Sequence, residues 1–289
     1  MANTIAAVYV QTFEQIVRHL AQQAEARLRN IVQERSTTGQ SHNWETMGQN
    51  TATAKTTRAQ ATPVNDSPWG RRQSLAATIN VGDLVEQEDP VQMLVDPNSN
   101  IAHSISMAMK RGLDDSIIAA AVGDSRDGDG AAVTFPAGQV IGSAATLFSY
   151  DLVTEAYEKF MQSDIDPSVR KCFVVGPTQL RKLQQLTEFT SSDYVNVKAL
   201  ATTGFVKAWM GFDWIVSTRL NAPTPGTDLE CFACTERAIG LQMNRDISVR
   251  VAEDPSVSFA WRVYAFGTWG AIRVEDEQLV KVWVKDSLT

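Results

Sequence analysis

Two cysteines spaced like a redox or metal-binding motif are the first residues here that could do chemistry. Cys231 and Cys234 form a CxxC pair, but the sequence holds no second CxxC or Cys/His pair to complete a zinc site. With Cys172, the cysteines make an odd and sparse set that suits reduced thiols better than a disulfide framework. We expect free thiols that serve as small residues on the strand "ECFACT", with no resident metal or cofactor.

Three carboxylates in a glycine-rich loop are the second candidate. Asp124, Asp127 and Asp129 lie in "GDSRDGDG" and could attract a divalent cation. Their spacing departs from the calcium-loop pattern, which needs further ligands and a distant Glu. We therefore expect a solvated turn, with a cation site as the alternative.

The sequence shows no nucleophile with an obvious base. A Ser/His/Asp triad is recognised by geometry, but no GxSxG elbow is present, and no histidine stands beside an evident Ser, Cys or carboxylate constellation. The histidines are His19, His42 and His103. We assign no catalytic residue.

A strand followed by a Gly-Pro break and a helix could instead hold a phosphate. The stretch "KCFVVGPTQLRKLQQL" has this form. Its turn lacks the glycine spacing of a Walker loop or a dinucleotide fingerprint, and Pro177 removes one backbone N–H donor. Pro at the start of a helix is ordinary architecture, so we expect a scaffold.

Basic residues near an aromatic side chain are the last candidates. Arg58, Arg71 and Arg72 lie near Trp69 and could bind nucleic acid or a carboxylate on another subunit. The chain has 26 Lys and Arg against 33 Asp and Glu, a net charge of -7. This balance argues against tight, non-specific nucleic-acid binding by the surface as a whole, so we favour the subunit contact.

The elements that must position these residues change character along the first quarter of the chain. Apolar residues at helical spacing predict an amphipathic helix over residues 14–32. Residues 36–67 are rich in Thr, Ser, Gln, Asn and Ala and cannot form a core of their own. The alternation in "TATAKTTRAQAT" suits an extended two-stranded arm lying on another surface. Such an arm needs a partner.

The rest of the chain mixes helices and strands. The run "SLAATINVGDLV" predicts a strand, and the longest helix is predicted over residues 96–122, with Pro97 at its first position and Gly123 closing it. A helix is expected over about residues 150–162, strands in "GFDWIVSTRL" and "ECFACT", and more strands over residues 246–285. With 44% apolar residues, the chain can form one large domain or two modest ones.

No membrane or export signal is evident. The start has no basic region followed by a sustained apolar one, and nowhere do about 18 apolar residues run together. We expect a soluble protein made in the cytoplasm.

This order of parts resembles the major capsid proteins of tailed bacteriophages, which share the Hong Kong 97 fold. The tracts "RRQSLAATINVGDLVEQEDP" and "NSNIAHSISMAMKRGLDDSIIAAAVG" are similar to the strand and long spine helix of that family. "KCFVVGPTQLRKLQQL" and "GFDWIVSTRL" are similar to parts of its axial domain. The resemblance implies an α+β fold with an N-terminal arm, an extended loop, a spine helix, and peripheral and axial domains.

The resemblance also implies a division of the chain. Residues 1–35 would be the N-terminal arm or helix and residues 36–74 the extended loop that reaches over a neighbouring subunit. Residues 75–142 and 246–289 would form the peripheral domain, and residues 143–245 the axial domain. Some family members crosslink this loop through Lys and Asn with help from a Glu; without a matching partner pair for Lys55, we assign no crosslink. The candidates for inter-subunit contact are Lys55, Arg58, Trp69, Arg71 and Arg72.

The implied function is structural, without catalysis. Copies would form hexamers and pentamers of an icosahedral head that encloses double-stranded DNA without sequence-specific binding. The resemblance further implies a portal, a separate scaffolding protein, possible decoration proteins, assembly in the host cytoplasm, residence in the virion and no membrane. The alternatives are an encapsulin-like compartment shell and an α/β enzyme that uses the CxxC pair and the Asp loop.

Overall fold

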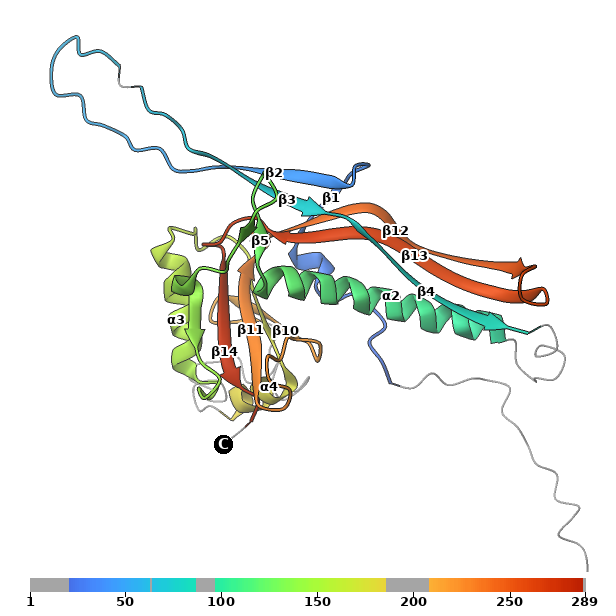
Figure 1. Cartoon of the computed structure of the whole chain (residues 1–289). Coiled ribbons are helices and arrows are strands. Elements are labelled where there is room, and N and C mark those ends of the chain that lie inside the picture. The colour runs from blue at the N-terminus through green and yellow to red at the C-terminus, as the bar shows by residue number, and fades with distance from the viewer. Residues whose placement is uncertain (1–20, 63, 87–96, 186–207, 288–289) are drawn as a thin grey trace, which may run out of the picture. The chain divides into compact units, whose positions relative to one another are not determined.

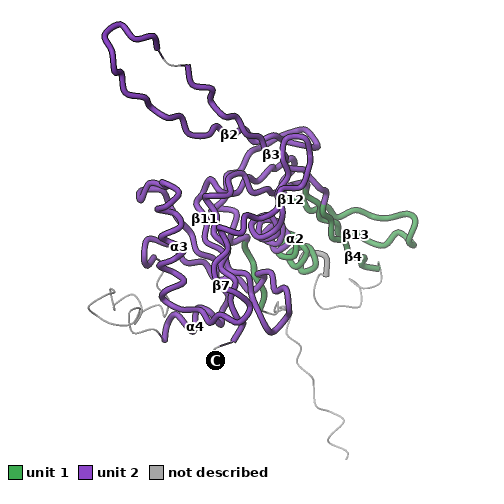
Figure 2. The backbone as a smooth tube through the Cα atoms, turned by 60° about the vertical axis from the view of Figure 1, so that its left-hand side comes forward, with its two compact units in different colours: residues 1–25, 79–110, 247–267 green, residues 26–78, 111–246, 268–289 purple. Residues whose placement is uncertain are grey.

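The computed structural model describes residues 21–62, 64–86, 97–185 and 208–287. They divide into two compact units, shown in two colours in Figure 2. The described part of unit 1 is residues 21–25, 79–86, 97–110 and 247–267; that of unit 2 is residues 26–62, 64–78, 111–185, 208–246 and 268–287. Four of the five boundaries fall inside an element, so one helix and three strands run from one unit into the other.

A six-stranded mixed sheet is the centre of unit 2. Strand β8 (Lys171–Val175) pairs in parallel with β10 (Phe212–Val216) and antiparallel with β11 (Asp228–Thr235). Strand β11 pairs antiparallel with β14 (Leu279–Lys285). Both faces of its central strands are buried, which explains their near-continuous apolar sequences. In spatial order the strands are β7 (Val140–Gly142), β14 (Leu279–Lys285), β11 (Asp228–Thr235), β8 (Lys171–Val175), β10 (Phe212–Val216) and β9 (Ala208–Trp209).

Two predicted helices belong to this unit. Helix α3 (Tyr150–Gln162) has the bounds that its periodicity predicts, and it buries an apolar face that includes Val153 and Phe160. The ring of Phe160 lies 6.0 Å from that of Phe212 on β10. Helix α4 (Pro177–Gln184) begins with Pro at its first position after the N-cap Gly176, as expected.

The long helix α2 (Pro97–Val122) is confirmed (Figure 1). It spans 26 residues, which corresponds to roughly 40 Å. Its apolar residues Met109, Leu113 and Ile117 recur at a spacing of four and are almost completely buried. The Gly123 N–H donates to Ala119 O at 3.0 Å and so ends the helix with a backbone hydrogen bond.

A second sheet contains the long strands of the chain. Its order is β1 (Gln33–Ser36), β12 (Ile239–Asp254), β13 (Ala260–Arg273) and β4 (Ala77–Val85). Within unit 1, Asn80 Nδ2 donates to Tyr264 Oη at 3.4 Å, and Arg262 forms an ion pair with Asp254 at 2.7 Å. Within unit 2, β1 runs parallel to residues 240–243 of β12. The strands predicted over residues 246–285 are confirmed.

The remaining elements are short. The hairpin of β2 (Ser41–Met47) and β3 (Trp69–Leu75) stands by itself as a two-stranded sheet. A second small hairpin joins β5 (Ser125–Arg126) to β6 (Ala132–Val133). The 3-10 turns are η2 (Arg29–Ile31) and η3 (Ala137–Gln139).

The predicted helix over residues 14–32 is wrong for its described part. Residues 21–32 contain only the single turn η2, and residues 14–20 lie outside the described residues. The Asp114 carboxylate accepts the backbone N–H groups of Arg27 at 3.0 Å and Leu28 at 3.1 Å. Tertiary hydrogen bonds thus take the donors that an α-helix would use, and the apolar Leu28 and Ile31 are buried without an α-helix.

One further expectation needs correction. The Thr-rich stretch over residues 51–62 has no strand pairing, because the pairing of β2 with β3 stops at Met47 and Trp69.

The strand β14 lies far from its sheet partners in the sequence. It pairs with β11 over seven residues, from Asp228↔Lys285 to Cys234↔Leu279. Cross-strand pairing between residues far apart in sequence leaves no local signal that would have assigned β14 to that sheet.

Candidate subunit-contact surface

A projecting arm is the most distinctive surface of unit 2. Its stem is the antiparallel pair β2 and β3, in register from Ser41↔Leu75 to Met47↔Trp69. Beyond the stem, the described residues between 48 and 68 form a loop that projects from the unit (Figures 1 and 2). Nearly all of these residues are exposed, so the loop makes no core.

The two segments of the loop are joined by a few separate hydrogen bonds instead of by regular strand pairing. The Gly48 N–H donates to Pro68 O at 2.8 Å. Farther along the loop, Asn50 Nδ2 donates to Ser67 Oγ at 3.0 Å and Asn65 Nδ2 donates to Thr51 O at 2.7 Å. Because these bonds are exposed to water, each stabilises the loop only slightly.

A local turn at the tip displays two cations. The side-chain oxygen Oε1 of Gln60 accepts the backbone N–H of Thr56 at 2.8 Å, and Ala59 has a positive φ of 60°. Lys55 and Arg58 lie at this turn and are exposed. Residues 48–65 contain no Asp or Glu, so the tip is locally positive on an acidic chain.

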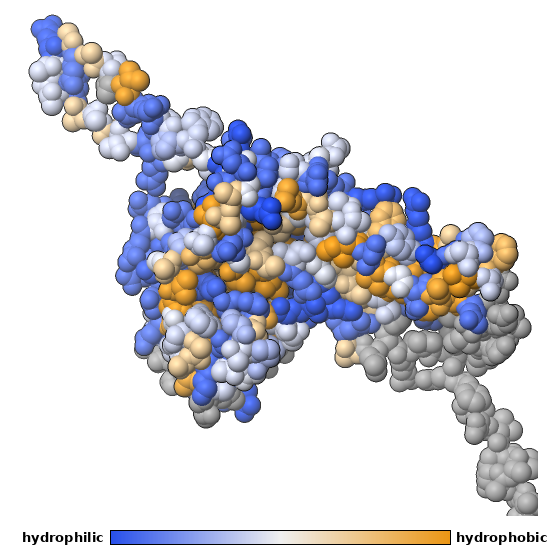
Figure 3. Space-filling view, viewed as in Figure 1, coloured by the Kyte–Doolittle hydropathy of each residue, from blue (hydrophilic) through white to orange (hydrophobic). Residues whose placement is uncertain are grey.

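Apolar side chains are exposed along the arm. Trp69 is 71% exposed and Met47 57%, and these two residues face each other across the stem. Val64 is 96% exposed in the loop. The arm is mainly hydrophilic in Figure 3, so these apolar residues interrupt a polar surface. Exposed large apolar groups on a projecting element are typical of a contact with another chain.

The predicted basic cluster is divided by the structure. Arg58 lies at the tip, whereas Arg71 and Arg72 lie in the stem on β3. Arg71 forms an ion pair with Glu45 across the stem at 2.8 Å, and both side chains are about half exposed. Arg72 pairs with Asp276 at 2.8 Å and is largely buried. Its guanidinium therefore already has a partner in its own chain.

The cysteines are buried, free thiols. Cys172 and Cys234 are opposite each other on β8 and β11, and all three cysteines are at most 1% exposed. Burial raises the pKa of Cys231 to about 12 and that of Cys172 to about 11. The thiols therefore stay protonated near neutral pH, which suits core residues and not nucleophiles or metal ligands.

The Asp-rich loop is a self-contained turn. The Asp127 carboxylate accepts the backbone N–H groups of Asp129 at 3.0 Å and Ala131 at 2.8 Å. Among the described residues, no three His, Cys, Asp or Glu side chains are grouped so that they could hold a metal ion. Within the same residues, no helix is long and apolar enough to cross a membrane.

The histidines do not form a common site among the described residues. His42 is on the arm stem, with its ring 4.9 Å from that of Trp44 in an edge-on contact. His103 is an exposed residue of α2. His19 lies outside the described residues.

The Gly-Pro turn packs closely against its surroundings. A Cβ on Gly176 would lie 2.5 Å from Gln179 Oε1 and 2.6 Å from Leu229 Cδ2. The space next to the turn is thus filled by the chain's own side chains. The turn joins β8 to α4 as scaffold, as the absence of a phosphate-loop glycine pattern predicts.

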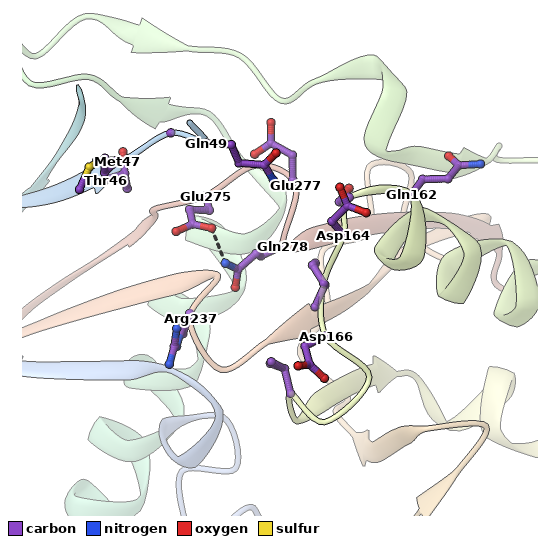
Figure 4. A pocket seen from close by; sticks show the side chains of 14 residues that line it. Thr46, Met47, Gln49, Gln162, Asp164, Asp166, Arg237, Glu275, Glu277 and Gln278 are labelled. Atoms are coloured by element: carbon purple, nitrogen blue, oxygen red, sulfur yellow. Dashed lines mark hydrogen bonds between the residues drawn. The ribbon is translucent and has the colours of Figure 1, made fainter. Parts of the chain in front are cut away.

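A pocket of about 640 Å³ lies where the arm stem meets the loops around Asp166 and Glu275 (Figure 4). Its lining is mostly polar and acidic, with Arg237 as its one cation, and Gln278 donates to Glu275. Ser168 N–H donates to the Asp166 carboxylate and lowers its pKa. The pocket combines carboxylates with amide side chains but shows no nucleophile with an adjacent base.

Sequence reasoning missed the exposed apolar residues Met47 and Val64 and the hydrogen bonds that join the two segments of the loop. A single Val in a long polar stretch was the available signal for Val64. These hydrogen bonds have no recognisable sequence signal, because Asn, Ser and Thr are common in any loop.

The sequence and the fold are both similar to known proteins. The family described as phage capsid protein matches residues 5–285. No curated protein matches the sequence. The low identities of the similar structures below show the likeness of the fold alone.

Solved phage capsids share this fold over nearly their whole length. The capsid of the Cyanophage P-SCSP1u is similar with a TM-score of 0.76 and 14% identity, over 98% of this chain and 95% of that chain. Mycobacterium phage Che8 gives 0.71 and 14%, over 95% and 97%. The capsid of a native GTA particle gives 0.68 and 15%, over 99% of both chains.

Proposed function

Since the chain belongs to the phage capsid protein family and has the Hong Kong 97-type α+β fold, we propose that it forms hexamers and pentamers of an icosahedral head. It is a structural protein of the virion. In this proposal the head encloses double-stranded DNA, held without sequence-specific contacts. The net charge of -7 suits a container that must not adhere to its contents.

The single observation that supports self-assembly most directly is the arm. The loop of the arm has no core of its own and its stem leaves Trp69 71% exposed, so the arm can gain buried surface from another chain. When every copy offers the same arm and the same receiving surface, head-to-tail contacts close into rings. Many modest contacts then add up to a stable shell.

We propose that the arm contacts a neighbouring copy through four residues. Lys55 and Arg58 at the tip are available for carboxylates of the neighbour, and Trp69 offers apolar surface. Arg71, which is about half exposed, can keep Glu45 and also contact the neighbour. Arg72 is the weakest of the original candidates because Asp276 already occupies its guanidinium.

The proposed division of the chain follows the sequence, with one change. Residues 1–35 are the N-terminal arm and residues 36–74 the extended loop. Residues 75–142 and 246–278 form the peripheral domain with its spine helix. Residues 143–245 form the axial domain, to which we add β14 because it pairs with β11.

The proposal extends to the partners that a DNA-filled head requires. A separate scaffolding protein directs assembly in the host cytoplasm, a portal occupies one vertex, and decoration proteins can cover the outside. A protein compartment shell would use the same fold, and the contents distinguish the two. Nuclease-protected double-stranded DNA supports the head, whereas a co-purified enzyme supports the compartment.

The first experiment is size-exclusion chromatography with light scattering, followed by electron microscopy of early-eluting material, with and without scaffolding protein. Rings or closed shells of many copies are expected. A strict monomer or dimer under both conditions would contradict the assembly function.

A matched variant tests the arm itself. Deletion of residues 52–63 should leave a folded subunit, because the stem and both sheets remain, but the subunit should no longer assemble. Circular dichroism checks the fold and light scattering the assembly. Normal shells from the deletion variant would refute the role of the arm.

A further inference from the structure

The stem of the arm packs against β12 within unit 2. Trp44 of β2 is 6% exposed and lies against Gly240 of β12, where a Cβ would be 2.6 Å from Trp44 Cε2. Ile272 and Val274 complete a small apolar cluster around the indole. Only glycine at position 240 allows this close approach of the stem to the strand.

A relay of buried polar groups extends this contact. Trp44 Nε1 donates to Ser74 Oγ at 3.1 Å, and Ser74 Oγ donates to Gln242 Oε1 at 2.8 Å. Gln242 Nε2 donates to Gly39 O and to Asn244 Oδ1, both at 2.9 Å. Ser74 is 1% exposed and Gln242 is fully buried. The relay therefore joins both strands of the stem to β12 and to the turn before the stem.

Such a relay favours one orientation of the stem over others. Apolar contacts alone tolerate small rotations, because dispersion and burial have little directionality. A buried donor or acceptor that loses its partner costs about 1–3 kcal/mol, so a rotation that breaks the relay is unfavourable. A fully satisfied buried network specifies a single geometry.

A second connection ties the stem to the end of the spine helix. Asp276 accepts Arg72 Nη2 at 2.8 Å and Arg273 Nε at 2.6 Å. Arg273 is fully buried, and its Nη1 donates to Gly123 O, just after the last residue of α2. The stem thus has two separate attachments to unit 2, one through Gln242 and one through Asp276.

A small rotation of the stem has a large effect at the tip. Each of the two segments of the loop has about ten residues and can reach about 30 Å when extended. A rotation of about 10° at the stem would then move the tip by about 5 Å, which is close to the spacing of adjacent strands. A head-to-tail contact closes into a ring only when its angle is fixed.

We propose that Trp44, Ser74 and Gln242, seated on Gly240, are positioning residues that set the direction of the arm and thereby the angle between neighbouring subunits. This inference rests on the proposed assembly function. It makes the stem a determinant of shell size and closure, separate from the loop residues that touch the neighbour.

The test measures arm direction in the unassembled subunit. Spin labels are attached at Met47→Cys, at the outer end of the paired stem, and at Asp151→Cys on α3, both exposed positions of unit 2. The native cysteines are buried and should not react. The unaltered stem should give one narrow distance distribution. Gln242→Met, which keeps the volume but breaks the relay, should broaden it at least about twofold.

Two further variants sharpen the result. Gly240→Ala should shift the mean distance, because its Cβ displaces the indole. The matched control Gln185→Met, at an exposed position after α4, should change nothing. In assembly reactions, Gln242→Met and Gly240→Ala should yield shells of variable diameter, whereas the control yields uniform ones.

The outcomes separate this inference from the proposed function. A wild-type chain that never assembles refutes the assembly function, while the distance distributions still report on arm direction. If the wild type assembles and both stem variants keep its distance distribution and shell diameter, the positioning role is wrong. Should thermal unfolding show that Gln242→Met does not fold, Ser74→Ala removes only the hydroxyl that joins Trp44 Nε1 to Gln242 Oε1 and carries the same comparison.

Discussion

At the scale of single residues, the cysteines that looked reactive are parts of the core. The three thiols lie on two adjacent strands of a sheet that is buried on both faces. Their raised pKa values arise first from desolvation, which disfavours the thiolate. A group buried in this way links stability to pH instead of performing catalysis.

The first prediction concerns this link. Above about pH 9 the unfolded chain releases thiol protons that the folded chain keeps, so the free energy of unfolding should fall as pH rises. For Cys231, whose pKa is raised to about 12, the loss should be about 1.4 kcal/mol per pH unit between about pH 9 and 11. Urea unfolding at several pH values measures it.

The control isolates the thiol from other titrating groups. Burial lowers the pKa of Lys171, which acts in the opposite direction in alkaline solution. Comparing the wild type with Cys231→Ala cancels that contribution, because Lys171 is present in both. The variant should show a shallower slope with pH, and equal slopes would contradict the assignment.

At the scale of elements, local sequence signals such as Pro and Gly predict the ends of a helix correctly when no tertiary hydrogen bond competes for its backbone groups. Helix α2 begins at Pro97 and ends before Gly123. Local signals failed over residues 21–32, where Asp114 takes the backbone donors of Arg27 and Leu28. An apolar period therefore predicts burial more reliably than it predicts the helix itself.

The second prediction tests the interior of α2. Gly112 is in this helix, and a Cβ built on it meets nothing within 4 Å. Gly112→Ala should therefore raise the free energy of unfolding by about 0.5–1 kcal/mol, since Ala loses less backbone entropy than Gly. Denaturant unfolding measures the change.

A second glycine of the same region serves as the comparison. A Cβ on Gly123 would lie 2.6 Å from Ala119 O, so Gly123→Ala should destabilise the fold. Opposite signs for the two variants are expected. A destabilising Gly112→Ala would indicate that its open side is occupied in the folded chain.

At the scale of the whole molecule, the proposed arm contact makes assembly directional. In this proposal each copy gives one arm and receives another, so a chain without the loop can still receive an arm but cannot pass the contact on. The deletion of residues 52–63 should therefore act as a terminator when mixed with intact chains.

The third prediction follows from this asymmetry. Adding about one deleted chain for every ten intact chains should reduce the yield of closed shells by far more than about one tenth, because each shell needs many copies. Electron microscopy and light scattering count the shells. The matched mixture with the control variant Gln185→Met should assemble normally. A loss merely proportional to the deleted fraction would argue against a head-to-tail contact.

The sequence by itself determined the mixed α+β class, the spine helix, the strand-turn-helix at Gly176 and the polar loop. Each of these follows from a hydrophobic period, a helix cap or an amino-acid composition that is visible within a short stretch of sequence. It also identified the family resemblance, because the order of tracts survives where identity is low.

Only the tertiary structure decided how distant residues meet. In the folded chain β14 pairs with β11, and Arg72 forms an ion pair with Asp276. Trp44 packs against Gly240, and its N–H donates to Ser74, which donates to Gln242. These contacts connect residues roughly 30 to 200 positions apart, and their energies depend on distances and directions that exist only in the folded chain. No local pattern in the amino-acid order records them.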